Sequence, residues 1–218
     1  MNKLGVIFDL DGVIVDTAKY HFIAWRETAR KLGFDFTEQH NEQLKGVSRV
    51  KSLELILKLA DKNITESEKE KFLVEKNEHY LSLISEMGKE EILPGMAEFL
   101  AYLRDKEIPF SLGSASKNAK LILKSLDLLD LFDAIVDGND VSKAKPDPEV
   151  FLIAADKINV APEHCVVIED AIAGVEAANT AGMMSIGIGE KEHLSHADYV
   201  LSSTSELTPV FFEEITKK

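Results

Sequence analysis

The chain has 218 residues, and its 25 Lys and Arg against 38 Asp and Glu give a formal net charge of −13. Such an excess of acid repels nucleic acid and anionic membranes, so we expect neither as a partner. No apolar stretch approaches the roughly 20 residues that span a bilayer, and the N-terminus lacks the long apolar region of a signal peptide. A single cysteine, Cys165, excludes an internal disulfide, and we expect a cytoplasmic monomer.

The first elements in chain order are one short strand and then a set of helices. Residues 4–8 are apolar and predict a buried strand. Residues 15–92 contain no convincing strand and carry three segments with apolar residues at helical spacing, "TAKYHFIAWRETARKLGF", "SRVKSLELILKLADKN" and "TESEKEKFLVEKNEHYLSLI". The last begins with Thr65 and Glu68, which are spaced as a capping box. We predict an inserted helical-bundle cap domain over residues 15–92, with Trp25 in its core.

The remaining chain alternates short apolar runs with helical patterns, which is typical of a parallel sheet covered on both faces. The predicted fold is therefore α/β, a doubly wound parallel sheet with a Rossmann-like core built from residues 1–14 and 93–218. Its strands are predicted within residues 108–116, 132–138, 164–170, 184–189 and 197–203, and its helices near 117–126, 146–160, 171–183 and 205–216.

Polar residues follow four of the predicted strands, where a parallel sheet places its ligand site. They are Asp9 and Asp11 after the first strand, Ser114 to Asn118 after "FSLG", Lys145 in "NDVSKAKPDP", and Glu169 and Asp170 after "CVVI". Taken singly, each has an ordinary structural explanation, such as a turn, a helix cap or an exposed lysine. Their convergence on one sheet edge predicts an active site.

The chemistry of this set fits phosphoryl transfer to a protein nucleophile. Asp9 can attack phosphorus and form an acyl phosphate, while Asp11 can act as a general acid and base. Attack of an anion on an anion needs compensating charge. Carboxylates of Asp9, Asp170 and Glu169 suit one Mg²⁺, Lys145 supplies a fixed positive charge, and Ser114 with the amides at 115–116 would bind the phosphoryl group.

The motifs "FDLDGVIVDT", "SLGSAS", "KAKPDP" and "VIEDAIAGVEAA" resemble the four motifs of the haloacid dehalogenase-like hydrolase superfamily. The resemblance covers the whole chain and implies Asp9 as nucleophile, Asp11 as acid–base, Mg²⁺ as cofactor and a cap that closes over the substrate. It also implies that Asp11 contributes its backbone carbonyl to the metal.

The superfamily includes dehalogenases, phosphatases and mutases, and the cap residues favour a mutase. "NEQLKGVSR" offers Lys45, Gly46, Val47 and Arg49 on a loop, although from pattern alone Arg49 is also typical of an exposed residue at a helix start. "YHFIAWR", "NEQLKGVSR", "EKN" and "SASKN" are similar to the sugar-phosphate mutases of the superfamily. That similarity implies that Arg49, Ser116 and Asn118 hold a non-transferring phosphate, and that Ser114, Ala115 and Lys145 hold the transferring one.

The same similarity implies that His21 and Lys76 couple cap closure to Asp11, and that Thr17, Trp25, Ser52 and Lys117 complete the substrate site. The expected reaction is interconversion of β-D-glucose 1-phosphate and D-glucose 6-phosphate through phosphorylated Asp9 and bound β-glucose 1,6-bisphosphate. Two alternatives stay open: a Mg²⁺-dependent sugar-phosphate phosphatase, and a phosphosugar-binding protein without catalysis. A dehalogenase is disfavoured because it would leave Asp11, Glu169 and Asp170 without a task.

Overall fold

The computed structural model describes residues 4–44 and 47–217 and divides into two compact units. The α/β unit consists of residues 1–16 and 88–218, and the helical unit of residues 17–87. These boundaries differ by a few residues from the sequence-based ones at 14–15 and 92–93. The reason is Val15, which forms isolated β-bridges with Asp11 and Ile92 and so belongs to the α/β unit.

The α/β unit contains one six-stranded sheet in the order β3-β2-β1-β4-β5-β6, and every neighbouring pair is parallel. This order is the Rossmann arrangement, in which the chain leaves a central strand first to one side and then to the other. The doubly wound fold predicted from the sequence is confirmed. The strands are β1 (Gly5–Phe8), β2 (Phe110–Gly113), β3 (Ala134–Val136), β4 (Cys165–Glu169), β5 (Met184–Ile188) and β6 (Tyr199–Leu201).

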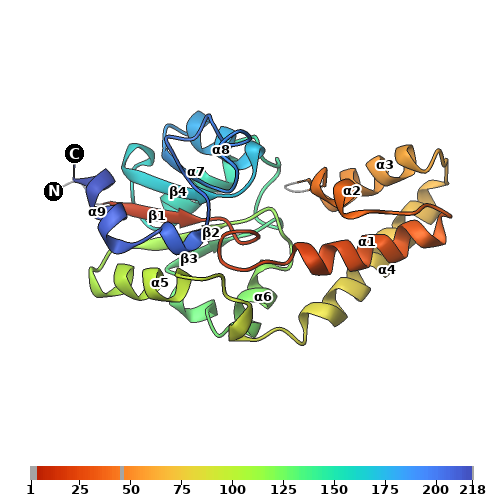
Figure 1. The fold of residues 1–218 in the computed structure, drawn as a ribbon, viewed down its shortest axis with the longest axis horizontal. Coiled ribbons are helices and arrows are strands. Elements are labelled where there is room, and N and C mark those ends of the chain that lie inside the picture. Colours follow the sequence, from red (N-terminus) through yellow and green to blue (C-terminus); the bar gives the residue numbers. More distant parts are fainter. Residues whose placement is uncertain (1–3, 45–46, 218) are drawn as a thin grey trace. The chain divides into compact units, whose positions relative to one another are not determined.

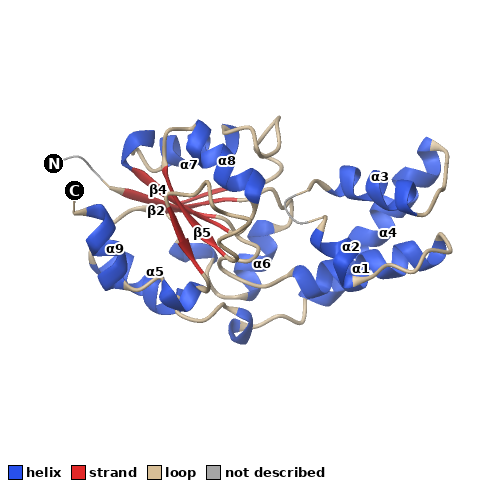
Figure 2. Cartoon of the chain, turned by 45° about the horizontal axis from the view of Figure 1, so that its top comes forward, coloured by secondary structure: helices blue, strands red, loops and turns tan. Residues whose placement is uncertain are grey.

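Helices cover both faces of this sheet (Figures 1 and 2). They are α5 (Met96–Asp105), α6 (Ala119–Ser125), α7 (Glu149–Lys157), α8 (Ile172–Thr180) and α9 (Pro209–Thr216), with 3-10 turns at Lys89–Glu91, Leu129–Leu131, Pro162–His164 and Thr204–Glu206. Three predicted helices begin late, including α6, which begins at Ala119 and not at Lys117. The helix expected at 146 begins at Glu149, after Pro146 and Pro148, and the last one begins at Pro209, where Thr208 caps it by accepting a hydrogen bond from the Phe211 N–H.

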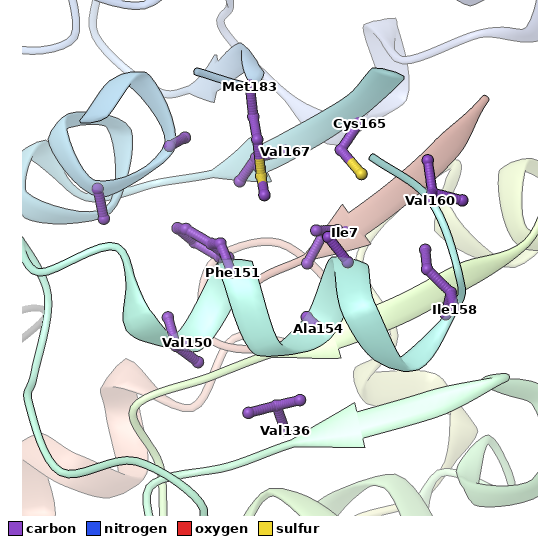
Figure 3. Packing of buried hydrophobic residues seen from close by; sticks show 13 residues of the cluster. Ile7, Val136, Val150, Phe151, Ala154, Ile158, Val160, Cys165, Val167 and Met183 are labelled. Carbon is purple, nitrogen blue, oxygen red and sulfur yellow. The ribbon is translucent and has the colours of Figure 1, made fainter. Parts of the chain in front are cut away.

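Successive residues of β1 serve opposite sides of the sheet, as strand geometry requires. Ile7 belongs to the cluster formed with α7, which includes Phe151 and Val167 and is shown in Figure 3. Phe8 packs edge-to-face against Phe99 of α5, with ring centroids 6.1 Å apart. Because β1 is buried on both faces, it reads in the sequence as a continuous apolar run and not as an alternating one.

The helical unit contains α1 (Ala18–Lys31), α2 (Glu38–Glu42), α3 (Arg49–Leu59) and α4 (Glu66–Ile84). Its core includes Trp25, Phe36 and Leu53, so the core position predicted for Trp25 is confirmed. The predicted capping box of Thr65 and Glu68 is also present at the start of α4. The short helix α2 was not predicted, because five residues carry too little periodicity to be recognised. Among the described residues, no helix is long and apolar enough to cross a membrane.

Candidate active site

The central feature of the site is a buried lysine between two carboxylates. The Lys145 Nζ lies 2.6 Å from Asp9 Oδ1 and 2.6 Å from Glu169 Oε1. Its side chain is only 3% exposed. Asp9 directly follows β1, and its N–H donates to the Ile168 carbonyl at 3.0 Å, which extends the β1–β4 ladder to the site. Asp9 and Glu169 lie at the carboxyl ends of the adjacent strands β1 and β4, and Lys145 reaches them from the loop after β3, so three distant segments meet at one edge of the sheet.

The electrostatics of this group leave negative charge in excess. Burial is the largest effect on Asp9 and raises its pKa to about 7, with Lys145 opposing and the charges of Glu169 and Asp11 reinforcing the rise. Burial lowers the pKa of Lys145, but its two carboxylate partners outweigh this effect and raise the pKa above its usual range. One ammonium faces two buried carboxylates, so the ionised group carries one uncompensated negative charge, and a bound cation would offset it.

The residues present fit a divalent metal ion. Asp9, Glu169 and Asp170 each offer a carboxylate oxygen, and these three atoms lie within 4.8 Å of one another. Oxygen donors of this kind, together with the excess negative charge, match the preference of Mg²⁺. Asp11, the fourth predicted ligand, is half-buried two residues beyond Asp9, and its charge acts on Asp9. The predicted metal roles of these residues remain predictions.

Two glycines make room for the acids. A Cβ on Gly12 would lie 2.1 Å from Asp170 Oδ2, and a Cβ on Gly174 would lie 1.9 Å from Glu169 Oε1. Gly12 also has a φ of 75°, in the left-handed region that other residues rarely adopt. At the start of α8, the Ala171 N–H donates to Glu169 Oε2 at 2.7 Å. The backbone therefore approaches both carboxylates closely, and no side chain larger than hydrogen fits at either glycine without a shift.

The loop after β2 carries the predicted phosphate-binding residues. Ser114 is buried, and its Oγ accepts a hydrogen bond from the Ser116 N–H at 3.1 Å. Ser116 Oγ in turn accepts from the Asn118 N–H at 3.3 Å. Ala115 and Lys117 are exposed. The helix predicted to begin at Lys117 begins at Ala119, which leaves residues 114–118 as a loop at the sheet edge.

In the helical unit, His21 and Lys76 are partners. The Lys76 Nζ lies 2.9 Å from His21 Nδ1 and sits 4.7 Å from the ring centroids of both Trp25 and Tyr80. The pKa of His21 is held well below its usual range by burial, and the charges of Lys76 and Arg49 act in the same direction. Three predicted site residues, His21, Lys76 and Arg49, therefore interact with one another within the helical unit.

The other predicted residues of the helical unit differ in exposure. Arg49 is the first residue of α3 and is half-buried, not a fully exposed helix-start residue, and Val47 is half-buried. Thr17, Trp25 and Ser52 are buried. Their contact with a substrate stays a prediction. Lys45 and Gly46 lie outside the described residues.

Sequence reasoning did not single out several residues that shape the site. Gly12 was predicted only to permit a turn, Gly174 has no predicted role, and the Phe151 ring, whose centroid is 4.6 Å from Lys145 Nζ, lies in a segment predicted only as a helix. No role was predicted for the turn "DGN" at 137–139. A glycine shortly after the end of a strand was the available signal for this turn, because it permits close approach of two backbones.

A parallel sheet that carries carboxylates and a buried lysine at one edge is typical of enzymes that transfer phosphoryl groups through an aspartate. A model of the haloacid dehalogenase-like hydrolase family matches residues 4–182, and the chain belongs to this family.

More similar relatives are known within the family. The chain is 45% identical over 205 residues to "Beta-phosphoglucomutase" of Bacillus subtilis, a match covering 93% of this chain and 91% of that protein. A crystal structure of β-phosphoglucomutase from Clostridium difficile superposes with a TM-score of 0.93 at 44% identity, covering 99% of this chain and 97% of that one. "Phosphorylated carbohydrates phosphatase" of Thermotoga maritima is 36% identical over 184 residues, or 83% of this chain and 82% of that protein.

Proposed function

We propose that the chain is a β-phosphoglucomutase, which interconverts β-D-glucose 1-phosphate and D-glucose 6-phosphate. The observation that carries this proposal is the 45% identity to the Bacillus enzyme over 93% of the chain. Because the match covers 93% of the chain, it includes most of the helical unit, where Arg49 and other residues expected of a mutase lie. The acyl-phosphate chemistry of Asp9 is common to mutase and phosphatase, so the choice between them rests on the residues proposed for the second phosphate, Arg49 in the helical unit and Ser116 and Asn118 in the α/β unit.

Asp9 is the proposed nucleophile. One of its carboxylate oxygens bonds to the phosphorus of β-glucose 1,6-bisphosphate, and the bond from phosphorus to the sugar oxygen breaks. Lys145, 2.6 Å from Asp9 Oδ1, keeps a positive charge beside the reacting oxygens. The carboxylates of Asp9, Asp170 and Glu169 and the carbonyl of Asp11 would hold one Mg²⁺, which supplies further charge neutralisation for the transferring group.

Asp11 is the proposed acid–base. Its carboxyl gives a proton to the sugar oxygen that leaves phosphorus, and it takes a proton from the sugar hydroxyl that later attacks phosphorylated Asp9. Phosphorylated Asp9 and β-glucose 1-phosphate thus give the bisphosphate, which reacts in the opposite orientation to release glucose 6-phosphate. Both half-reactions balance, and no phosphate is lost to water.

The second phosphate of the substrate needs its own binding residues. We propose Arg49, Ser116 and Asn118 for this group, with Ser114, Ala115 and Lys145 on the transferring one. His21 and Lys76 would couple closure of the helical unit to Asp11, and Thr17, Trp25, Lys45, Gly46, Val47, Ser52 and Lys117 would complete the site. The protein would act as a cytoplasmic monomer on small sugar phosphates.

A Mg²⁺-dependent sugar-phosphate phosphatase is the second candidate, favoured by the 36% identity to the Thermotoga phosphatase. The two activities are separated by their products. Purified protein is incubated with Mg²⁺, β-glucose 1-phosphate and a trace of β-glucose 1,6-bisphosphate, and both glucose 6-phosphate and inorganic phosphate are measured. We expect glucose 6-phosphate with little inorganic phosphate, and comparable release of inorganic phosphate would favour the phosphatase.

A further inference from the structure

The loop after β3 lies directly against the loop of residues 114–118. The Gly138 N–H donates to the Ser116 carbonyl at 3.3 Å, and the Asn139 Nδ2 donates to the Lys117 carbonyl at 3.2 Å. A Cβ on Gly138 would lie 2.4 Å from the Ala115 carbonyl oxygen. The carbonyl oxygens of Ala115, Ser116 and Lys117 therefore all face the short turn at residues 137–139. No role was predicted for this turn.

This turn is itself held rigidly. Asp137 is 2% exposed, and its Oδ1 accepts hydrogen bonds from the Asn139 N–H at 2.8 Å and from Asn139 Nδ2 at 2.9 Å. Lys120 of α6 approaches Asp137 Oδ2 at 3.8 Å. The Asn139 amide is thus fixed by Asp137 and directed at the neighbouring loop. At the base of both loops, the Ser114 N–H donates to the Val136 carbonyl at 3.0 Å.

We propose that the 137–139 turn positions the phosphate-binding loop: it donates hydrogen bonds to the carbonyl oxygens of Ser116 and Lys117 and packs against that of Ala115, so that this loop presents donors to an anion. Carbonyl oxygens repel phosphate oxygens, whereas amide N–H groups and hydroxyls attract them. Gly138 and Asn139 act through Ser116 and Lys117 and are positioning residues. The inference rests on the proposed function, because that function assigns residues 114–118 to both phosphates.

Two substitutions test the turn without replacing any of the proposed binding residues. Gly138→Ala places a methyl group against the Ala115 carbonyl, and Asn139→Ala removes the donor to Lys117. Asn179→Ala is the matched control, because the Asn179 Nδ2 also donates to a backbone carbonyl, that of His196, at 2.8 Å. Loss of one such hydrogen bond at the loop should weaken anion binding about fivefold to tenfold.

The probe is inorganic phosphate, titrated calorimetrically into each protein with Mg²⁺ present, alongside KM and kcat for β-glucose 1-phosphate. We expect Asn139→Ala to weaken phosphate binding and raise KM about fivefold to tenfold, Gly138→Ala to exceed this, and Asn179→Ala to change neither by more than about twofold. Urea unfolding should shift similarly for the two asparagine variants.

Unchanged phosphate affinity in Asn139→Ala, or an equal loss in Asn179→Ala, would overturn the inference. Asn139 is exposed, so its variant remains informative if Gly138→Ala does not fold. Wild-type protein that neither binds phosphate nor turns over sugar phosphates would refute the proposed function instead, and the inference would fall with it.

Discussion

At the scale of single residues, the site is organised by charge that the fold has buried. Lys145 is enclosed with Asp9 and Glu169, and neither carboxylate would be stable there without it. The sequence predicted these three residues because each follows a strand that ends at the same sheet edge. It did not predict their 2.6 Å contacts, since those depend on how α7 and α8 pack on the sheet.

The first prediction concerns Asp11. Asp11→Asn removes a proton donor but keeps the backbone carbonyl proposed for the metal. We expect turnover to fall by about 10²–10⁴-fold, the usual contribution of general acid–base catalysis, while Mg²⁺ affinity changes little. Steady-state kinetics and Mg²⁺ titration measure the two quantities. Near-normal turnover would remove Asp11 from its role.

The second prediction concerns pH and His21. Its pKa is held well below 6.5 in the folded chain by burial, with Lys76 and Arg49 acting in the same direction and Tyr80 stacked on the ring. Below pH 6.5 the unfolded chain therefore binds a proton on His21 that the folded chain does not bind. The contribution of neutral His21 to the unfolding free energy is fully present above this pH and is lost as the pH falls.

We expect the unfolding free energy of the wild-type protein to decline below pH 6.5 more steeply than that of His21→Gln, by at most about 1.4 kcal/mol per pH unit. Urea titrations between pH 8 and 5 measure it, with His193→Gln, an exposed histidine, as the control. Parallel pH profiles for the wild-type protein and His21→Gln would contradict this account.

At the scale of elements, the start of α8 is shaped for Glu169. A glycine in a helix is ordinarily less favourable than alanine by about 1 kcal/mol, so Gly174→Ala would be expected to stabilise α8. The Glu169 carboxylate occupies the space of that methyl group. We therefore expect Gly174→Ala to lower the unfolding free energy by about 2 kcal/mol or more, because the displaced carboxylate loses its contacts with Lys145 and Ala171.

The test is a double-mutant cycle followed by urea unfolding. In the Glu169→Ala background the carboxylate is absent, and Gly174→Ala should become neutral or stabilising. An equal destabilisation in both backgrounds would show that Gly174 is needed for another reason.

The elements themselves were largely predictable from the sequence. The four inner strands of the sheet are almost fully buried and leave apolar runs, the half-buried edge strands β3 and β6 leave shorter ones, and α1, α3 and α4 carry periodic stripes. The helix boundaries were less predictable, because Pro148 and Thr208 override the periodicity. The 137–139 turn could not be assigned to the site, because its role depends on a neighbour from another strand.

At the scale of the whole molecule, the proposal assigns the chemistry to the α/β unit and the recognition of the second phosphate partly to the helical unit. Arg49→Ala should therefore lower mutase activity by about tenfold to a hundredfold, the effect of losing a charge-assisted contact. Hydrolysis of acetyl phosphate, which has no second phosphate, should change by less than about twofold.

Arg30→Ala is the matched control, since Arg30 lies in the same unit and pairs with Glu27 at the surface, where such pairs contribute little. Equal losses of both activities in Arg49→Ala would argue against a role in binding the distal phosphate.

A mutase moves phosphate from one position of the sugar to another and does not release it as inorganic phosphate. The most direct measurement uses protein phosphorylated on Asp9 by β-glucose 1,6-bisphosphate labelled with ³²P, with Asp9→Asn as the control that takes up no label. After a chase with unlabelled β-glucose 1-phosphate, we predict that the label appears in the bisphosphate and then in glucose 6-phosphate. Label released mainly as inorganic phosphate, or label bound equally by Asp9→Asn, would contradict the account.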